Sequence, residues 1–155
     1  MMLDISNYVN YPMSRKILKK SHSININFND GNFMIDFPDG STGSFIPLQT
    51  HWHSPSEHSV NGKLYDLEMH IVHLYEDGSL GAVLGIFFDR EAGGNYDNDF
   101  IESVDWADAT PGGTEITYVN MRTFLRSLDL DHYWSYDGSL TTPPCTEGIK
   151  WSVLE

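Results

Sequence analysis

The sequence predicts a mostly β (α+β) fold, in which a central, twisted and largely antiparallel sheet is accompanied by a few short helices. Three observations lead to this prediction: short runs of alternating apolar and polar residues recur, turn-forming Gly, Asn, Asp and Pro separate them, and only two segments have helical periodicity. The 155 residues contain no repeat or linker-like stretch, so we expect a single domain over residues 1–155.

The first two predicted strands follow each other closely. In residues 24–28 isoleucine or phenylalanine alternates with asparagine, and residues 29–32 (Asn-Asp-Gly-Asn) have the composition of a turn. The alternation resumes over residues 33–37 and ends at the Pro-Asp-Gly sequence of residues 38–40. We therefore expect a half-buried strand, a turn and a returning strand.

Three further strands are predicted in the middle of the chain. Residues 45–53 and 64–74 are two candidates, and residues 76–79 (Glu-Asp-Gly-Ser) are typical of a hairpin turn that leads into the apolar run of residues 80–88. A continuous apolar run of this length indicates a central strand that is covered on both faces.

Two short helices are predicted after these strands. Residues 97–107 place apolar side chains on one helical face, and Asn120 is a candidate N-cap for a helix over residues 121–128. The segment from residue 129 onward is rich in aromatic residues, Gly and Pro, and we expect it to be irregular.

Charge and cysteine content exclude several classes of function. Lys and Arg number 9 against 22 Asp and Glu, and the formal net charge of −13 would repel nucleic acids and anionic membrane surfaces. No apolar run reaches the length of about 18 residues that a membrane span requires, and residues 1–16 lack the apolar core of a secretory signal. The single cysteine, Cys145, excludes an internal disulfide and a cysteine-based metal cluster.

Three of the seven histidines are spaced as ligands of one metal ion. His51 and His53 flank Trp52, and alternate residues of a strand project from the same face. The gap between His53 and His70 is long enough for a turn and an antiparallel return, which would bring the third imidazole opposite the pair. Three such imidazoles can hold a zinc ion at about 2.0–2.1 Å and leave a fourth position for water.

Two polar residues strengthen this interpretation. Gln49 and Glu68 each share a strand face with the histidine two positions later, and a metal-bound histidine usually donates its other ring N–H to such a group. Taken alone, a His-x-His pair is more often a surface or hydrogen-bonded pair than a metal site, so the whole set carries the prediction. His73 has the opposite parity to His70 and is not assigned to that face.

The residues around these histidines resemble the α-class carbonic anhydrases. Four blocks occur in the order and spacing of that family: residues 48–58 (LQTHWHSPSEH), 68–73 (EMHIVH), 81–88 (GAVLGIFF) and 133–151 (YWSYDGSLTTPPCTEGIKW). The resemblance implies the fold of the family and the zinc-dependent, reversible hydration of CO2 to bicarbonate and a proton, through a hydroxide on the zinc.

The resemblance also implies a role for individual residues. His51, His53 and His70 would be the Zn²⁺ ligands, Gln49 would support His51, and Glu68 would support His70.

Proton transfer and substrate binding involve further residues by the same resemblance. Thr141 would contact the hydroxide, Glu57 would accept the hydroxyl proton of Thr141, and His22 would be the proton shuttle. The residues that would bind the substrate are Val72, Val83, Leu140, Thr142 and Trp151. Considered singly, Thr141 could be a turn residue, His22 an exposed histidine, and the apolar residues ordinary core.

The chain departs from the family pattern in three places. The usual domain of the family is longer at both ends, so we expect a partial domain with unpaired strand edges, taken from a longer protein. Before His22, Lys20 and Ser21 stand where the family usually has Asn-Gly. In secreted members the cysteine at the position of Cys145 commonly forms a disulfide, which favours an extracytoplasmic parent protein; alternatively, Cys145 is a small buried residue.

Two alternative functions stay open. His51, His53 and Glu57 match the His-x-His-x3-Glu fragment of cupin-type metal enzymes, which would use iron or manganese. The other alternative is a non-catalytic, carbonic-anhydrase-related binding module, although such modules typically lack at least one zinc histidine. Apart from CO2 or bicarbonate, no partner is expected, and the sequence does not indicate an oligomeric state.

Overall fold

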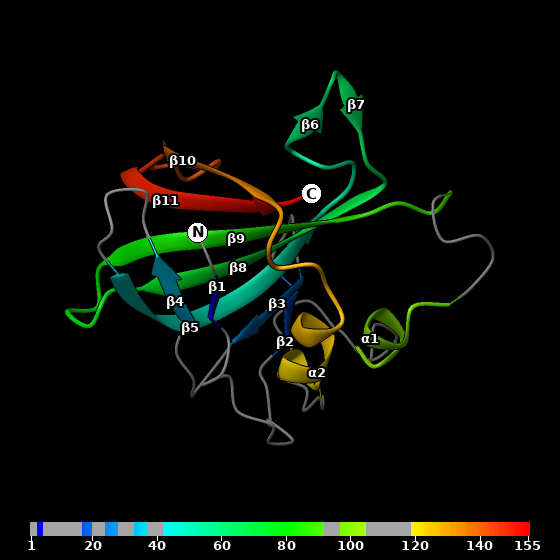
Figure 1. Ribbon diagram of the computed structural model, residues 1–155, viewed down its shortest axis with the longest axis horizontal. Helices are drawn as coiled ribbons and strands as arrows, with labels where there is room; N and C mark the ends of the chain where they lie inside the picture. The colour runs from blue at the N-terminus through cyan, green and yellow to red at the C-terminus, as the bar shows by residue number, and fades with distance from the viewer. Residues whose placement is uncertain are drawn as a thin grey trace.

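The computed structural model confirms the predicted fold class. It describes residues 3–4, 17–19, 24–27, 33–36, 42–91, 97–104 and 119–155. Nine of the described strands form one twisted, mixed sheet (Figure 1), and these strands are β1 (Leu3–Asp4), β2 (Ile17–Lys19), β3 (Ile24–Asn27), β4 (Phe33–Asp36), β5 (Thr42–His53), β8 (Leu67–Leu74), β9 (Leu80–Phe88), β10 (Tyr133–Ser139) and β11 (Glu147–Leu154). The remaining described elements are a small hairpin of β6 (Ser59–Val60) and β7 (Lys63–Leu64) and the helices α1 (Asp99–Glu102) and α2 (Met121–Arg126).

The long strand β5 organises the first half of the sheet. Its first residues pair antiparallel with β4, its last residues pair antiparallel with β3, and its other edge pairs antiparallel with β8. β8 then pairs antiparallel with β9, β11 joins β9 in parallel, and β10 pairs antiparallel with β11. The sheet is therefore largely antiparallel, as predicted, and β9–β11 is the parallel pair among its described strands.

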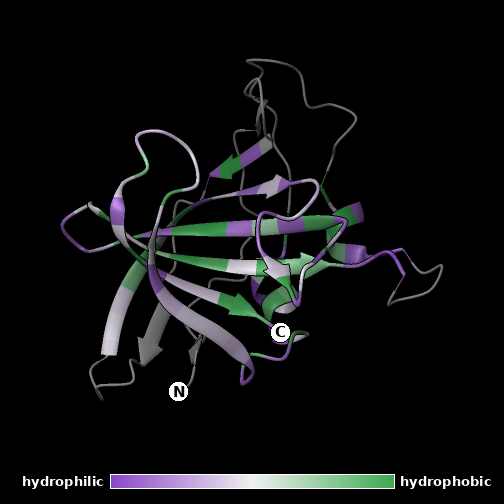
Figure 2. Ribbon diagram, turned by 90° about the horizontal axis from the view of Figure 1, so that it is seen from above, coloured by the Kyte–Doolittle hydropathy of each residue, from purple (hydrophilic) through white to green (hydrophobic). Residues whose placement is uncertain are grey.

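Apolar residues cover both faces of the central strands. On one face Met69 and Leu84 share a buried cluster with Phe124 of α2, and on the other face Val83 packs with Trp151 of β11. In Figure 2 hydrophobic residues recur along these strands, whereas the connecting segments are mostly hydrophilic. β9 is thus a central strand that is buried on both sides, as its continuous apolar sequence predicts.

The predicted turn and the second helix are also confirmed. The turn between β8 and β9 is closed by a hydrogen bond from Tyr75 N–H to the carbonyl of Ser79, and Gly78 has the positive φ of 84° that favours glycine. At the start of α2 the side chain of Asn120 accepts a hydrogen bond from the N–H of Thr123.

Other predicted elements are shorter or lie outside the described residues. The helix expected over residues 97–107 spans only Asp99–Glu102, with Asn98 as its N-cap. Residues 105–107 and the turns expected at residues 29–32 and 38–40 lie outside the described residues.

The expectation of an irregular segment after residue 129 is wrong. β10 and β11 form an antiparallel pair, and the Pro residues that suggested irregularity lie in the connection between them. The pairing contains an irregularity after Gly138, near which Gly148 has a φ of 82°. Cys145 lies in the same connection and is exposed, so the alternative of a small buried cysteine is also wrong.

A β-bulge in β5 decides which way its histidines point. In the pairing of β5 with β8, Pro47 is opposite His73 and Gln49 is opposite Val72, so Leu48 is an additional residue. Proline cannot donate a backbone hydrogen bond, and in strands it is commonly found at such irregularities.

The bulge reverses the alternation of β5. Before it, the odd-numbered Phe45 belongs to the core cluster on the helix side, and after it the even-numbered Trp52 does. His51 and His53 consequently face the opposite side, whereas uninterrupted alternation from Phe45 would direct them into the core.

Neither of the two described helices is long and apolar enough to cross a membrane.

His73, in β8, is a fully buried histidine away from the predicted metal ligands. Burial lowers the pKa of its imidazole to about 3, although hydrogen bonding to the backbone of Ile71 and Ala82 opposes this shift. In the unfolded chain a histidine titrates near pH 6.5, so between these two pH values the unfolded state binds a proton that the folded state does not bind. The folded state therefore loses stability as the pH falls through this range.

We expect the free energy of unfolding to fall by up to about 5 kcal/mol from this one group between pH 6.5 and 3. Denaturant unfolding at a series of pH values measures this effect. In His73→Gln the free energy of unfolding should depend less steeply on pH, by the equivalent of about one bound proton. His132→Gln, which changes an exposed histidine, is the control and should not flatten it. An unchanged pH dependence in His73→Gln would contradict the prediction.

Candidate metal centre

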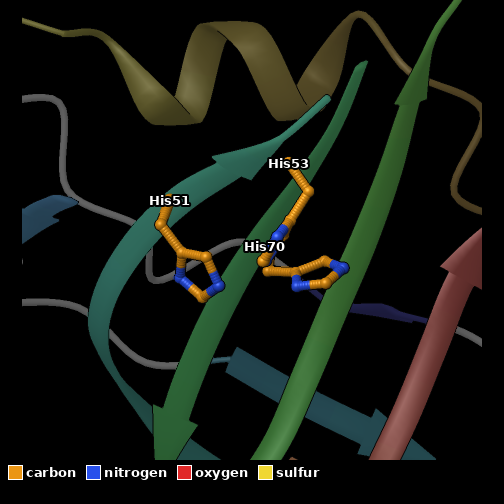
Figure 3. A group of neighbouring side chains, drawn as sticks. All are labelled: His51, His53 and His70. Atoms are coloured by element: carbon orange, nitrogen blue, oxygen red, sulfur yellow. The ribbon is translucent and has the colours of Figure 1, made fainter. Parts of the chain in front are cut away.

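Three histidines meet on the face of the sheet opposite the helices. His51 and His53 come from β5 and His70 comes from β8, where it is directly opposite His51 in the pairing. One ring nitrogen of each lies within 4.8 Å of the others, and the ring centroids are 4.7, 4.9 and 5.3 Å apart (Figure 3). The structure thus brings together the three histidines that the sequence singles out.

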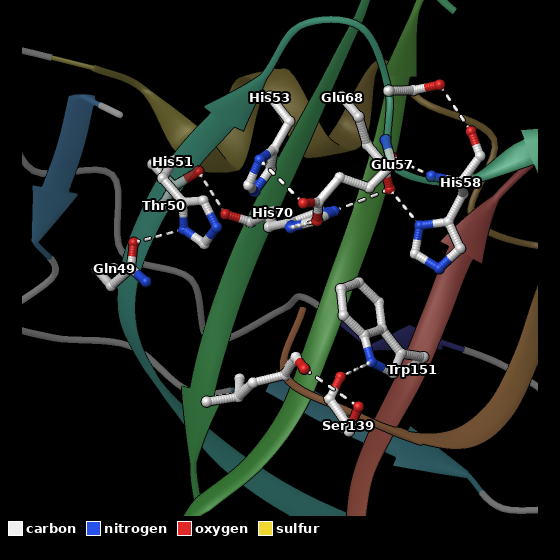
Figure 4. Close-up of polar contacts among 12 residues, drawn as sticks. Gln49, Thr50, His51, His53, Glu57, His58, Glu68, His70, Ser139 and Trp151 are labelled. Atoms are coloured by element: carbon white, nitrogen blue, oxygen red, sulfur yellow. Dashed lines mark hydrogen bonds and ion pairs between the residues drawn. The ribbon is translucent and has the colours of Figure 1, made fainter. Parts of the chain in front are cut away.

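Two of these histidines are oriented by the side chains expected from the sequence. His51 Nδ1 donates to Gln49 Oε1 over 2.9 Å, and His70 Nε2 donates to Glu68 Oε1 over 2.9 Å (Figure 4). A donated ring N–H places the lone pair on the other nitrogen, which is Nε2 of His51 and Nδ1 of His70. Both rings are therefore held in a tautomer that can bind a metal.

The third histidine has a buried nitrogen without a partner. His53 Nε2 makes no hydrogen bond among the described residues, and such an orphaned buried polar atom is costly unless it binds something. Burial and the nearby His70 lower the pKa of His53, although Glu57 and Glu68 oppose the shift. The imidazole is therefore kept in the neutral form that metals require.

Behind His70, a fully buried carboxylate collects four hydrogen bonds. Glu68 accepts from the backbone N–H of Glu57 (2.8 Å) and of His58 (2.9 Å), from His58 Nδ1 (2.6 Å) and from His70. Although burial by itself raises the pKa of Glu68, the hydrogen bonds from His58 and His70 lower it well below the usual range. Because His58 Nδ1 donates to Glu68, its Nε2 accepts the hydroxyl proton of Tyr136 over 2.6 Å.

Sequence reasoning does not find His58 and Tyr136. His58 precedes the short strand β6, so strand alternation says nothing about its direction, and Tyr136 lies on β10, 78 residues further along the chain. The contact of Tyr136 with His58 depends on the pairing of β10 with β11, which places Tyr136 opposite Trp151.

A cavity of about 200 Å³ opens beside the histidine cluster. His51 and His70 line one part of it, and apolar side chains form most of the rest. Its lining includes all five residues that the resemblance assigns to the substrate, Val72, Val83, Leu140, Thr142 and Trp151, together with Leu48 and Leu80, which were not predicted.

The three residues with predicted roles in proton transfer are placed differently. Thr141 lines the cavity, whereas the carboxylate of Glu57 lies 3.4 Å from His53 Nδ1 and 4.0 Å from His70 Nδ1. No hydrogen bond between Thr141 and Glu57 is found among the described residues, and their partnership stays a prediction. His22 lies outside the described residues.

Comparison with known proteins relates the whole chain to one family. The model of the eukaryotic-type carbonic anhydrase family matches residues 1–155. A carbonic anhydrase of Nostoc sp. is 36% identical in an alignment of 155 positions, which covers 97% of this chain and 53% of that protein. A carbonic anhydrase of Pectobacterium carotovorum is 32% identical over 144 residues, which are 92% of this chain and 55% of that protein. The chain spans about half the length of these relatives.

Solved structures agree with the sequence matches. The α-carbonic anhydrase of Photobacterium profundum superposes with a TM-score of 0.80 at 30% identity, over 100% of this chain and 66% of its own. The enzyme of Thermovibrio ammonificans, solved with the inhibitor sulfanilamide, superposes with a TM-score of 0.82 at 32% identity, over 100% of this chain and 64% of its own.

We expect Glu68→Ala to lower the free energy of unfolding by about 3–5 kcal/mol, because it leaves the donors of His58, His70 and the backbone unsatisfied in a buried place. Denaturant unfolding in the presence of a chelator measures this effect without any contribution from a bound metal. Glu76→Ala, in the exposed turn between β8 and β9, should change the stability by less than about 0.5 kcal/mol. If Glu68→Ala lowered the free energy of unfolding by less than about 1 kcal/mol, the four hydrogen bonds to Glu68 would contribute little to stability.

Proposed function

Because this chain belongs to the eukaryotic-type carbonic anhydrase family, we propose that it is a zinc enzyme for the reversible hydration of carbon dioxide to bicarbonate and a proton. The observation that carries the proposal is the convergence of His51, His53 and His70 beside a largely apolar cavity. We propose residues 1–155 as one domain that corresponds to part of the longer relatives.

Zinc suits the donors of this site. Three neutral imidazoles with room for a further ligand from the cavity are typical of catalytic zinc, and binding would satisfy the buried Nε2 of His53. When bound, zinc lowers the pKa of its water to about 7, a value known from carbonic anhydrase itself, and so supplies a nucleophile at neutral pH. The contribution of Gln49 and Glu68 is to hold the ligand rings of His51 and His70 in the binding tautomer.

The cavity wall suits an uncharged substrate. Carbon dioxide has no net charge and no dipole, so close apolar contacts hold it without a need for buried polar partners. We propose that it lies beside His51 and His70 against the five lining residues Val72, Val83, Leu140, Thr142 and Trp151.

Two further residues have proposed roles in orientation and in proton release. We propose that the hydroxyl of Thr141, which lines the same cavity, orients the attacking oxygen. We further propose that His22 carries the product proton to buffer, since an imidazole with an ordinary pKa near 6.5 can take up and release a proton near neutral pH.

The two alternative functions are less well supported. A cupin-type metal enzyme finds no support in a family match that covers residues 1–155. A non-catalytic binding module would not require three convergent histidines, one of which has a buried nitrogen without a partner among the described residues. A chain that binds zinc in equimolar amount but does not accelerate CO2 hydration would favour the binding module.

We expect His70→Ala to lower the bound zinc from about one ion per chain to nearly none, and to reduce CO2 hydration to the uncatalysed rate. Elemental analysis after dialysis and stopped-flow hydration assays measure the two effects. His51→Ala should give the same result from a less buried position, and His132→Ala, at an exposed histidine, should change neither quantity. Retention of zinc and activity by His70→Ala would refute the assignment.

We expect His22→Ala to slow turnover in weakly buffered solution and to recover when imidazole is added, because a diffusing base can replace the shuttle. Zinc content should stay unchanged in this variant. Equal turnover of His22→Ala and the unaltered chain in weak buffer would remove His22 from the mechanism.

A further inference from the structure

Gly85 lies inside β9, where a glycine is unfavourable. Glycine weakens a strand, because it loses more backbone freedom on folding and has no side chain to pack. Its neighbours in the chain, Leu84 and Ile86, belong to the apolar run that forms the strand. We propose that Gly85 is a positioning residue, which leaves the space from which the Glu68 carboxylate orients His70. This role presupposes the proposed zinc site.

The pairing of the strands places Gly85 beside the histidine cluster. It is directly opposite His70 of β8 on one side and is paired with Val153 of β11 on the other. Directly opposite residues of an antiparallel pair project from the same face of the sheet. Glu68, two positions before His70 on β8, shares that face as well. A side chain at position 85 would therefore stand among His70, Glu68 and Val153.

The nearest atom to such a side chain is the oxygen that supports His70. A β-carbon at position 85 would lie 3.1 Å from Glu68 Oε1, which is closer than an ordinary van der Waals contact. The same oxygen accepts from His70 Nε2 over 2.9 Å and from His58 Nδ1 over 2.6 Å (Figure 4). To accommodate the added carbon, the carboxylate would have to move, and both hydrogen bonds would change with it.

Backbone conformation does not explain the glycine. Among the described residues the glycines with positive φ are Gly62, Gly78 and Gly148, so the backbone at Gly85 is one that other residues can adopt. Packing against β11 does not explain it either, because the β-carbon would lie 3.4 and 3.6 Å from the two methyl groups of Val153, which are ordinary contacts. The space that Gly85 leaves is thus needed by the carboxylate.

The ring N–H groups of His58 and His70 test this role in the metal-free chain. We would label the histidines with ¹⁵N and record these two N–H signals by NMR in the presence of a chelator. Gly85→Ala should shift both signals and make both protons exchange faster with water, because their shared acceptor is displaced. Signals that stay in place would overturn the proposal.

Metal affinity tests the consequence for the proposed zinc site. We would titrate the full chain with Co²⁺ and Zn²⁺ in competition with a chelator and record the visible spectrum of the Co²⁺ form. Gly85→Ala should bind both metals about tenfold more weakly, the lower end of the range for a disturbed supporting contact, and should alter the Co²⁺ bands. Unchanged affinity would overturn the proposal even if the ring signals shift.

Gly81→Ala is the matched control in the same strand. Its β-carbon would meet the rings of Phe45 and Tyr75 at 2.8 and 2.9 Å, and neither ring belongs to the histidine cluster. We expect this variant to lower the stability of the fold and to leave the ring N–H signals and the metal affinity unchanged. If Gly81→Ala weakened metal binding as much as Gly85→Ala does, the effect would be one of general stability and the proposal would fail.

A double variant tests whether Gly85 acts through Glu68. In Glu68→Ala the carboxylate is gone, and the closest contacts left to a β-carbon at position 85 are those with Val153. Adding Gly85→Ala to Glu68→Ala should therefore weaken metal binding no further, whereas a second loss of about tenfold would overturn the proposal. If the unaltered chain binds neither metal, the proposed zinc site fails, and the ring N–H signals still report whether Gly85 makes room for the carboxylate.

Discussion

The complete burial of the Glu68 carboxylate is the constraint on which the rest of the site depends. A charge removed from water must be compensated, and here four hydrogen bonds from two histidines and two backbone N–H groups do so. These donors come from β8 and from the segment that precedes β6, and His58 extends the network to Tyr136 on β10. One side chain therefore connects the elements that surround the candidate metal centre, and it also orients His70, a proposed ligand.

The two faces of the sheet have different roles: one packs against the helices, and the other carries the histidine cluster. On the helix side Met69, Leu84 and Phe124 form part of the larger apolar cluster, and on the other side Val83 and Trp151 belong to a smaller cluster beside the histidines. Because β8 and β9 are buried on both faces, the strand that carries His70 has little freedom to move. Rigid central strands are a suitable base for ligands that must meet at one point.

The electrostatics of the cluster suit a cation, although the chain is strongly acidic. The −13 net charge is a property of the whole molecule, whereas the three proposed ligands are histidines and the compensated Glu68 lies directly behind one of them, His70. A cation at the cluster would therefore be stabilised electrostatically. The adjoining cavity is lined mostly by apolar side chains, which suits an uncharged molecule. The histidine cluster and the apolar cavity therefore provide neighbouring environments, one suited to the proposed metal and the other to the proposed substrate.

The sequence alone determined the class of fold, the central strand at residues 80–88 and the three histidines, because strand alternation and turn composition are local properties of the chain. It also pointed to Gln49 and Glu68, since residues two apart on a strand share a face. The bulge at Leu48, the contact of Tyr136 with His58 and the direction of Glu57 were decided by the tertiary structure. Each of these depends on which strands become neighbours and in which register, and pairings between distant segments leave no periodic signal in the residues that make them.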